Sequence, residues 1–261
     1  MLILHMSAAD LLFALITMVP TMAITATVPV FHGPDLLCKF VKFLQVIPMY
    51  ASSFLLVAIS ADRFQAICRP LVSMKSNAYK RPALYAGVAW TLALLFSTPQ
   101  FVLFTKREGD CVGTYTSPYQ YALYVTVFNT VVWLLPSALT GYLYFLINSA
   151  GTKNDIKQRM IRSIQFAGGI LQCMELDRRR AQTVKLTLTI VAANFILWAP
   201  FCIISVIDAL WPSVINPTFA TYIMFFGNLN SCANPWIWFC FNRKQIELAL
   251  PCCASTDPLL R

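Results

Sequence analysis

The amino-acid sequence predicts an all-α membrane protein, in which a bundle of helices crosses the lipid bilayer several times. Of the 261 residues, 58% are hydrophobic and only 12% are charged, about half the charge that an ordinary soluble domain carries. The apolar residues are gathered into long runs, and about 20 such residues are enough for a helix to cross the hydrocarbon core. The lysines and arginines fall between these runs. Composition and charge distribution therefore both indicate a polytopic helical bundle.

Six runs are long and apolar enough to be spanning helices. Their approximate residue numbers are 1–25, 36–67, 82–104, 119–147, 183–210 and 218–241. Several of them contain a proline, which membrane helices tolerate when neighbouring helices satisfy the freed backbone groups. The chain opens directly inside the first run, with no signal peptide in front of it. We expect one transmembrane domain over residues 1–250 and a cytoplasmic tail over 251–261.

The second run is the one around which the others are organised. Its polar residues follow Cys38 at helical spacing and therefore share one stripe: Lys42, Gln45, Met49 and Ser52. A lysine and a glutamine inside an apolar span are costly unless they face protein or water. The stripe therefore predicts a polar face inside the bundle that binds a ligand.

The basic residues predict the orientation in the membrane. Most of the 20 lysines and arginines lie in the stretches 63–81 and 153–185 and in the C-terminal tail. The positive-inside rule places these stretches in the cytoplasm. Cys38 and Cys111 are then the two cysteines at the outer surface, where the oxidising environment permits a disulfide between them.

The end of the chain predicts a membrane-surface segment. Residues 242–250 combine basic and apolar side chains in the pattern of a short amphipathic helix on the inner leaflet. Cys252 and Cys253 follow it and are candidates for palmitoylation. The alternative is a pair of unmodified tail cysteines.

Asp10 is a carboxylate in the middle of the first apolar run, where it costs about 2.5–3.5 kcal/mol even on a lenient insertion scale. Oxygen-bearing side chains from other helices are available as partners: Ser52, Asn230, Ser231 and Asn234. Hard oxygen ligands of this kind suit a small hydrated cation such as sodium. The alternatives are a purely structural hydrogen-bond network and a protonated aspartate.

Two classes of function are disfavoured. The net charge of +9 would suit a nucleic-acid-binding protein, but the basic residues sit in loops between apolar runs. No nucleophile–base pair or metal-ligand cluster is apparent, since His5 and His32 lie far apart in sequence and no CxxC motif is present. We therefore expect neither an enzyme nor a metalloprotein.

Several further motifs follow one another along the chain: Asp62-Arg63-Phe64, Trp90, Pro136 with Tyr144, Trp198-Ala199-Pro200-Phe201 and Asn234-Pro235-Trp236-Ile237-Trp238. Together with Asp10 and the outer pair Cys38 and Cys111, they resemble a rhodopsin-like (class A) G-protein-coupled receptor over nearly the whole chain. In this resemblance Asp62-Arg63-Phe64 stands for the family's DRY, Trp198-Ala199-Pro200-Phe201 for CWxP and Asn234-Pro235-Trp236-Ile237-Trp238 for NPxxY. The resemblance implies a rhodopsin-like seven-helix architecture with only six helices present, because the family's first transmembrane helix and N-terminal segment are absent. It also implies that these motifs serve activation and contact with a heterotrimeric G protein.

Finer matches lie in the stretches Phe31–Cys38, Thr98–Gln100 and Asn230–Trp236 and in the Lys42/Gln45 pair. They are similar to the vasopressin/oxytocin receptors, and the mixture of matches and departures resembles a nematode member. The resemblance implies a plasma-membrane receptor for a vasopressin/oxytocin-like peptide. The ligand-binding residues that it implies are Lys42, Gln45 and Gln100, with Met49, Trp198 and Met224 as the pocket floor and wall.

Some positions depart from the family pattern. Asn194 replaces a phenylalanine one turn below Trp198, and Trp238 replaces the final tyrosine of NPxxY. Arg180 stands where some relatives carry an acid, so we expect no ionic lock between the helices there. Two alternatives remain: a truncated, non-signalling receptor isoform or fragment, and a six-span transporter. A transporter would usually show an internal repeat, and none is apparent.

Overall fold

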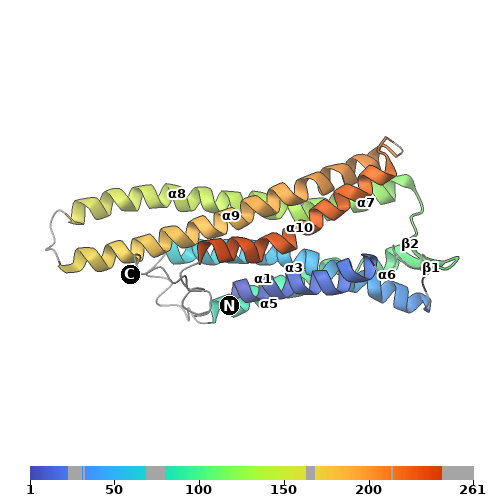
Figure 1. The fold of residues 1–261 in the computed structure, drawn as a ribbon, viewed down its shortest axis with the longest axis horizontal. Coiled ribbons are helices and arrows are strands. Elements are labelled where there is room, and N and C mark those ends of the chain that lie inside the picture. Colours follow the sequence, from blue (N-terminus) through green and yellow to red (C-terminus); the bar gives the residue numbers. More distant parts are fainter. Residues whose placement is uncertain (23–30, 32, 69–79, 163–167, 213, 243–261) are drawn as a thin grey trace, which may run out of the picture.

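The structure, a computed structural model of residues 1–261, describes residues 1–22, 31, 33–68, 80–162, 168–212 and 214–242. The side chains at 150–181, 217, 221, 224–226 and 228 lie outside this description. Within these limits the protein is an elongated bundle of long helices with one small hairpin at its end (Figure 1).

The elements follow the predicted runs closely. In chain order they are α1 (Leu2–Leu12), the π-helical turn η1 (Phe13–Met18), α3 (Asp35–Cys68), α5 (Arg81–Ser97), α6 (Gln100–Leu103), β1 (Phe104–Arg107), β2 (Asp110–Gly113), α7 (Pro118–Asn129), the π-helical turn η2 (Thr130–Leu134), α8 (Leu135–Arg162), α9 (Gly168–Leu210) and α10 (Pro217–Phe241).

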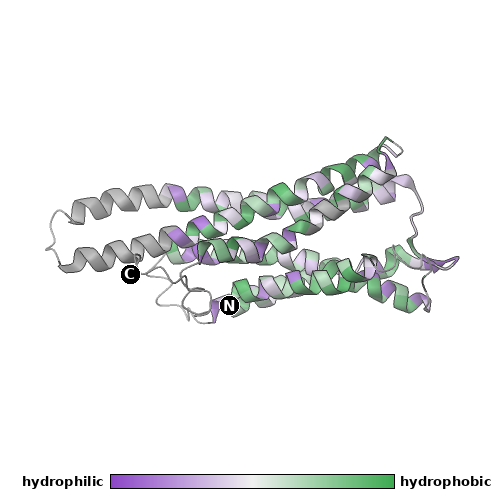
Figure 2. Ribbon diagram, viewed as in Figure 1, coloured by the Kyte–Doolittle hydropathy of each residue, from purple (hydrophilic) through white to green (hydrophobic). Residues whose placement is uncertain are grey.

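Five helices of the described chain are long and apolar enough to cross a membrane: Leu2–Met22, Asp35–Cys68, Arg81–Leu103, Pro118–Ser149 and Gln182–Leu210. The sixth predicted span, α10, has 25 residues but carries several asparagines, which lower its mean hydropathy. Figure 2 shows apolar residues along the lengths of the helices and hydrophilic residues gathered at the hairpin. The prediction of an all-α membrane bundle is confirmed.

The third, fourth and fifth predicted runs agree within two residues with the apolar spans Arg81–Leu103, Pro118–Ser149 and Gln182–Leu210. Phe104, the last residue of the third predicted run, begins β1. The helices that contain the fourth and fifth runs are longer than predicted, because α8 continues past residue 147 to Arg162 and α9 begins before residue 183, at Gly168. Figure 1 shows these two helices extending together past the rest of the bundle. The added turns contain many lysines, arginines, glutamines and leucines, which favour helix, so the chain leaves the apolar zone without unwinding.

Both π-helical turns lie just before a proline. Turn η1 precedes Pro20 and η2 precedes Pro136. A proline has no N–H to donate, and its ring clashes with the carbonyl four residues earlier. A widened turn accommodates that ring inside a continuous helix, and such bulges are common at functional positions. The sequence signalled the prolines but not the form of the bulges.

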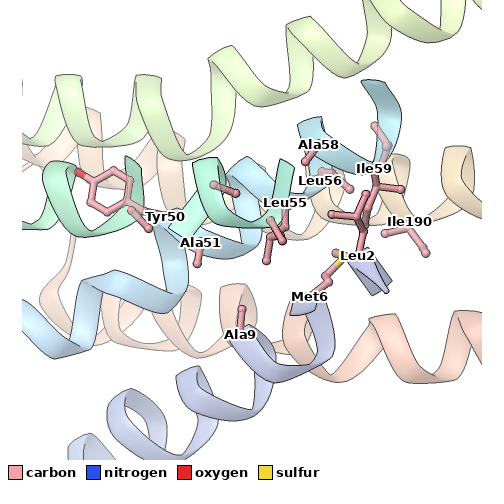
Figure 3. Packing of buried hydrophobic residues seen from close by; sticks show 14 of the residues in the cluster. Leu2, Met6, Ala9, Tyr50, Ala51, Leu55, Leu56, Ala58, Ile59 and Ile190 are labelled. Atoms are coloured by element: carbon pink, nitrogen blue, oxygen red, sulfur yellow. The ribbon is translucent and has the colours of Figure 1, made fainter. Parts of the chain in front are cut away.

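Helix α3 lies at the centre of the apolar core, as predicted for the second run. It packs against α1, α5 and α8. Figure 3 shows its buried side chains meeting Leu2, Met6 and Ala9 of α1 and Ile190 of α9. On α5 the residues that are buried are small, namely Ala86, Ala89, Ala93 and Ser97. Small residues let helix backbones approach closely in a membrane, where packing rather than water drives association.

A disulfide fastens the hairpin to the start of α3. Strands β1 and β2 pair antiparallel, and their turn places Glu108 and Gly109 at positive φ. Cys111 of β2 is bonded to Cys38 of α3, with 5.6 Å between the Cα atoms. The predicted pairing is confirmed. The bond spans 73 residues of sequence, which corresponds to about 4 kcal/mol of stabilisation on the loop-entropy model.

Candidate functional site

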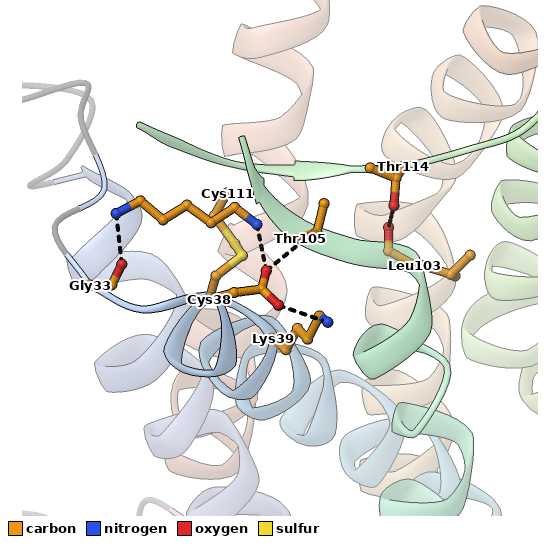
Figure 4. The surroundings of a disulfide bond; sticks show 9 residues. Gly33, Cys38, Lys39, Leu103, Thr105, Cys111 and Thr114 are labelled. Atoms are coloured by element: carbon orange, nitrogen blue, oxygen red, sulfur yellow. Dashed lines mark hydrogen bonds and ion pairs between the residues drawn. A yellow bond between two sulfur atoms is a disulfide. The ribbon is translucent and has the colours of Figure 1, made fainter. Parts of the chain in front are cut away.

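The hairpin is held against α3 by a carboxylate as well as by the disulfide (Figure 4). Asp35 accepts hydrogen bonds from Thr105 Oγ1 at 2.6 Å and from the backbone N–H of Lys106 at 2.8 Å, and it pairs with Lys39 at 2.8 Å. Lys106 Nζ in turn donates to the Gly33 carbonyl at 2.7 Å. Sequence reasoning missed Asp35 as a contact, although an acid in the first turn of a helix next to the cysteine was a usable signal. These bonds fix the outer rim of the bundle.

Lys42 and Gln45 lie one helical turn apart on α3, below this rim. The Lys42 ammonium lies 5.5 Å from the centroid of the Phe104 ring, within the range of a cation–π contact. Gln45 is half-buried, and its backbone carbonyl accepts a hydrogen bond from Thr17 Oγ1 at 2.9 Å. The predicted polar stripe therefore exists, and its lysine is held by an aromatic ring rather than by an acid.

Gln100 has an observed partner of its own. It is 1% exposed, and its Nε2 donates to the phenolic oxygen of Tyr124. This bond joins α6 to α7, so Gln100 contributes to helix packing as well as to any outer cavity. Sequence reasoning placed Gln100 correctly inside the bundle but did not identify Tyr124.

Trp198 and Met49 meet at the base of the polar stripe. Trp198 of α9 is 8% exposed and makes edge contacts with Phe13 and Phe201, at ring-centroid distances of 6.5 and 5.5 Å. Both Trp198 and Met49 line a small internal cavity that also reaches Asp10. Pro200 lies two residues beyond Trp198, inside the same helix. The side chain of Met224 lies outside the described residues.

The predicted polar network around Asp10 is present. The carboxylate is 6% exposed; Asn234 Nδ2 donates to it at 2.9 Å and Ser52 Oγ at 3.5 Å. Ser231 also approaches it. The adjoining cavity has a volume of about 10 Å³, enough for one water molecule or a small cation. Three of the four predicted partners therefore contact the carboxylate.

Asn230 lines the same cavity but bonds elsewhere. Its Nδ2 donates to Asn194 Oδ1 at 3.0 Å, and the two side chains are 2% and 3% exposed. The hydrogen bond of Asn230 therefore goes to Asn194, which the sequence offered only as a departure from the family, and not to Asp10. A buried amide group needs such a partner. The role of Asn230 in a cation site stays a prediction.

The inner end of α3 carries an ionic cluster. Asp62 is buried and pairs with Arg63 at 3.6 Å, as predicted, and with Arg81 of α5 at 3.3 Å. Arg81 also donates to Gln65 Oε1 at 3.2 Å, and Gln65 donates to the Tyr85 hydroxyl at 2.6 Å. Sequence reasoning assigned Arg81 only to a basic loop, because the register of α5 against α3 is not visible in the sequence.

The remaining inner-face residues pack near this cluster. Phe64 and Trp238 contact the apolar core, and Pro235 lies inside α10, which continues to Phe241. Tyr144 is 4% exposed, and its hydroxyl makes no hydrogen bond within the described part of the chain. Ser60 and Thr187 approach that hydroxyl, but their own hydroxyls donate to carbonyls within their helices. Tyr144 is thus a buried polar group open to a new partner.

Three predictions concern residues outside the description. The amphipathic segment 242–250 lies outside the described residues except for Asn242, the tail cysteines Cys252 and Cys253 lie wholly outside them, and the side chain of Arg180 is likewise not described. Among the residues that the structure does describe, no group of three metal-ligating side chains occurs.

The protein has the architecture of a helical membrane receptor. Its membrane bundle carries a disulfide-anchored outer hairpin, a buried aspartate and an inner Asp-Arg pair. The family model of the seven-transmembrane receptors of the rhodopsin family matches residues 1–238. The chain therefore belongs to that family, as the motifs predicted. It is a multi-pass protein of the plasma membrane, and its relatives are receptors rather than enzymes.

Comparison with known proteins narrows the position of the chain within this family. The chain is 64% identical to Nematocin receptor 1 of Caenorhabditis elegans over 279 residues, which cover 100% of the chain and 74% of that protein. It is 43% identical to Nematocin receptor 2 of the same species, over 96% of the chain and 69% of the relative. The Vasopressin V2 receptor of Sus scrofa is 34% identical, over 98% of the chain and 74% of the relative. The predicted vasopressin/oxytocin-like and nematode-like character is confirmed.

Proposed function

We propose that this chain binds a vasopressin/oxytocin-like neuropeptide in its outer half and transmits that binding to a cytoplasmic heterotrimeric G protein. The observation that carries the proposal is the polar stripe of α3, which runs from the disulfide-anchored hairpin down to the cavity beside Trp198. The similarity to nematocin and vasopressin receptors supports a peptide of this class.

Recognition in this proposal depends on polar groups in a partly dry site. Lys42 and Gln45 offer donors and an acceptor to the carbonyls and amides of a peptide backbone, while Gln100 and Tyr124 close the site on the α7 side. Buried polar groups that lose their partners cost about 1–3 kcal/mol each. A peptide that pairs them is therefore favoured over one that leaves them unpaired. Met49, Trp198 and Met224 provide the apolar floor and wall.

Transmission in this proposal passes through Trp198 and the Asp10 network to the inner ionic cluster. A ligand shifts the equilibrium between two arrangements only by its difference in affinity for them. Pressure on Trp198 reaches Asp10 through the cavity that both side chains line. A sodium ion held by Asp10 and Ser52, with Asn230 and Asn234 around the cavity, favours the closed arrangement. Opening the inner face frees Arg63 from Asp62 to contact the G protein, with Tyr144 as an available buried partner.

The membrane itself is the other proposed partner. The segment 242–250 lies on the inner leaflet, and palmitoyl groups on Cys252 and Cys253 strengthen that attachment, since stable anchoring needs more than one lipid-binding signal. Hydroxylamine-sensitive incorporation of labelled palmitate, lost in a variant with both cysteines changed to serine, tests this part.

The decisive test measures peptide binding and G-protein activation together. Membranes that contain the chain, alone and preceded by the N-terminal segment of Nematocin receptor 1, are titrated with a panel of vasopressin/oxytocin-like cyclic peptides. We expect saturable binding and peptide-dependent loading of G protein with a non-hydrolysable GTP analogue. Gln45→Ala should weaken binding roughly five- to 150-fold. The matched control is Gln182→Ala, since Gln182 is exposed at the inner end of the apolar span Gln182–Leu210 of α9. Binding without G-protein loading would identify a non-signalling receptor, and no binding in either form would refute the proposal.

A further inference from the structure

Three tyrosines gather at the outer end of the bundle. Tyr115 lies in the link between β2 and α7, and Tyr121 and Tyr124 lie one turn apart on α7. The ring of Tyr115 is 5.1 Å from that of Tyr121, edge to face, and 6.2 Å from that of Tyr124. All three rings are half-buried, so each has one part in contact with protein and another part exposed.

The link that carries Tyr115 is fixed by its neighbours. A side chain on Gly113 would place its Cβ 2.7 Å from a carbon of the Tyr115 ring, so only glycine lets the backbone lie so close to that ring. Gln120 Oε1 accepts from the backbone N–H and the hydroxyl of Thr116 at 2.7 and 2.8 Å. Ser117 then caps α7 by accepting from the N–H of Gln120. The ring is therefore positioned before any ligand arrives.

The rings are neutral and rich in π-electron density at physiological pH. Burial, with the neighbouring hydroxyls of Tyr124 and Tyr121, raises the pKa of Tyr115 to about 12. A neutral tyrosine presents a negative ring face that attracts ammonium and guanidinium groups within about 6 Å. A cluster of such rings is therefore suited to a cation and not to an anion.

A carboxylate stands next to these rings without a cation of its own. Asp208 of α9 is half-buried and lies within electrostatic range of the Tyr121 hydroxyl, and α7 packs against α9. It forms no ion pair with any residue that the structure describes. The lysines at the outer end are engaged elsewhere: Lys39 with Asp35, Lys42 with the Phe104 ring, and Lys106 with the Gly33 carbonyl. A half-buried carboxylate that pairs with none of the described cations is available to a cation that a ligand brings.

We propose that Tyr115, Tyr121 and Asp208 form a subsite for an arginine or lysine side chain of the peptide ligand. The proposal rests on the proposed function, since it assumes a peptide in the outer cavity. The carboxylate neutralises the cation and the ring faces cover its apolar stem, which is how long basic side chains are usually accommodated. The subsite makes Asp208 a specificity-determining residue, selecting basic ligands over neutral ones of the same shape.

The test uses two synthetic cyclic peptides of the vasopressin class that differ at one residue outside the ring, arginine in one and citrulline in the other. Citrulline has nearly the same shape as arginine but no charge. Competition against a labelled peptide should show the wild-type protein preferring the arginine peptide by about tenfold or more, which corresponds to about 1.4 kcal/mol. Asp208→Asn should reduce the preference to within about threefold while leaving the citrulline peptide unaffected, and Asp208→Glu should retain most of it.

Two further comparisons separate the subsite from general effects. Glu108→Gln also removes one negative charge, but from the exposed hairpin turn, so it should preserve the preference for the arginine peptide. If Glu108→Gln reduced that preference as much as Asp208→Asn does, long-range electrostatic attraction would be responsible, and the subsite would be refuted. Tyr121→Leu should weaken the arginine peptide roughly two- to thirtyfold, whereas Tyr121→Phe keeps the ring and the affinity. Equal binding of both peptides to the wild type refutes the subsite alone. Failure of both peptides to bind refutes the proposed function on which it rests.

Discussion

The ionic cluster at the inner end of α3 leads to a quantitative prediction for Arg81→Met. Methionine keeps much of the length and apolar stem of arginine but removes the guanidinium. The side chains of Asp62 and Arg81 are 10% and 13% exposed, so solvent screens their attraction little. Without Arg81, the one ion pair that Asp62 keeps among the described residues is the longer 3.6 Å pairing with Arg63, and Gln65 Oε1 loses its donor at 3.2 Å.

The expected loss follows from these contacts. A hydrogen bond to a charged group contributes about 1.5–3 kcal/mol, and the remaining Arg63 contact offsets part of the cost of leaving Asp62 partly unpaired. We expect a net loss of about 2–3 kcal/mol in the free energy of unfolding. For a protein of this size about 2–4 °C of melting temperature corresponds to 1 kcal/mol, so the melting temperature in detergent should fall by about 4–12 °C.

A double-mutant cycle with Asp62→Asn makes the prediction specific. If the two side chains stabilise one another, the double variant should lose less stability than the sum of the single losses, by about 1–2 kcal/mol. Lys80→Met is the matched control, because Lys80 is an exposed neighbour of Arg81, and it should leave the melting temperature nearly unchanged. Additive losses in the cycle would show that the pairing contributes nothing and would refute the reasoning.

Three other predictions concern the outer and middle layers. Cys111→Ser should lower the free energy of unfolding by about 4 kcal/mol. Adding Cys38→Ser to that variant should cause no further loss, as measured by thermal unfolding of the single and double variants. Raising sodium should weaken agonist binding in the wild type but not in Asp10→Asn; a wild type insensitive to sodium would leave only a structural role for this network. Asn194→Leu should cost about 1–3 kcal/mol by leaving Asn230 unpaired in the interior, and further replacement of Asn230 by leucine should recover part of the melting temperature if that bond is the cause.

Much of the fold was predictable, because long apolar runs have few options in a bilayer. A backbone in lipid must satisfy its own polar groups, and a helix is the local way to do so. The spans were therefore recoverable from hydropathy, and the Cys38–Cys111 bond from orientation. The ends of the helices were less predictable: α8 and α9 continue past residues 147 and 183, because helix propensity and not hydropathy decides where a polar segment unwinds.

The site was predictable in its residue types but not in all of its partners. Asp10 required polar neighbours, and the asparagines and serines of α3 and α10 were the available ones. The choice among them depended on distance: Asn234 contacts the carboxylate, whereas Asn230 turns to Asn194. The prediction that no ionic lock forms at Arg180 stays a prediction, since that side chain is not described.

The sequence by itself determined the class of fold, the membrane orientation and the residues too costly to bury without partners, because these follow from the energetics of transfer into lipid, residue by residue. The tertiary structure decided which groups face each other: Asp35 against the hairpin, Arg81 against Asp62, and Asp208 beside the tyrosines of α7. These pairings join segments far apart in sequence, and they depend on how each helix is rotated and shifted against its neighbours. Close packing fixes that register over many small contacts at once, and no local stretch of sequence carries it.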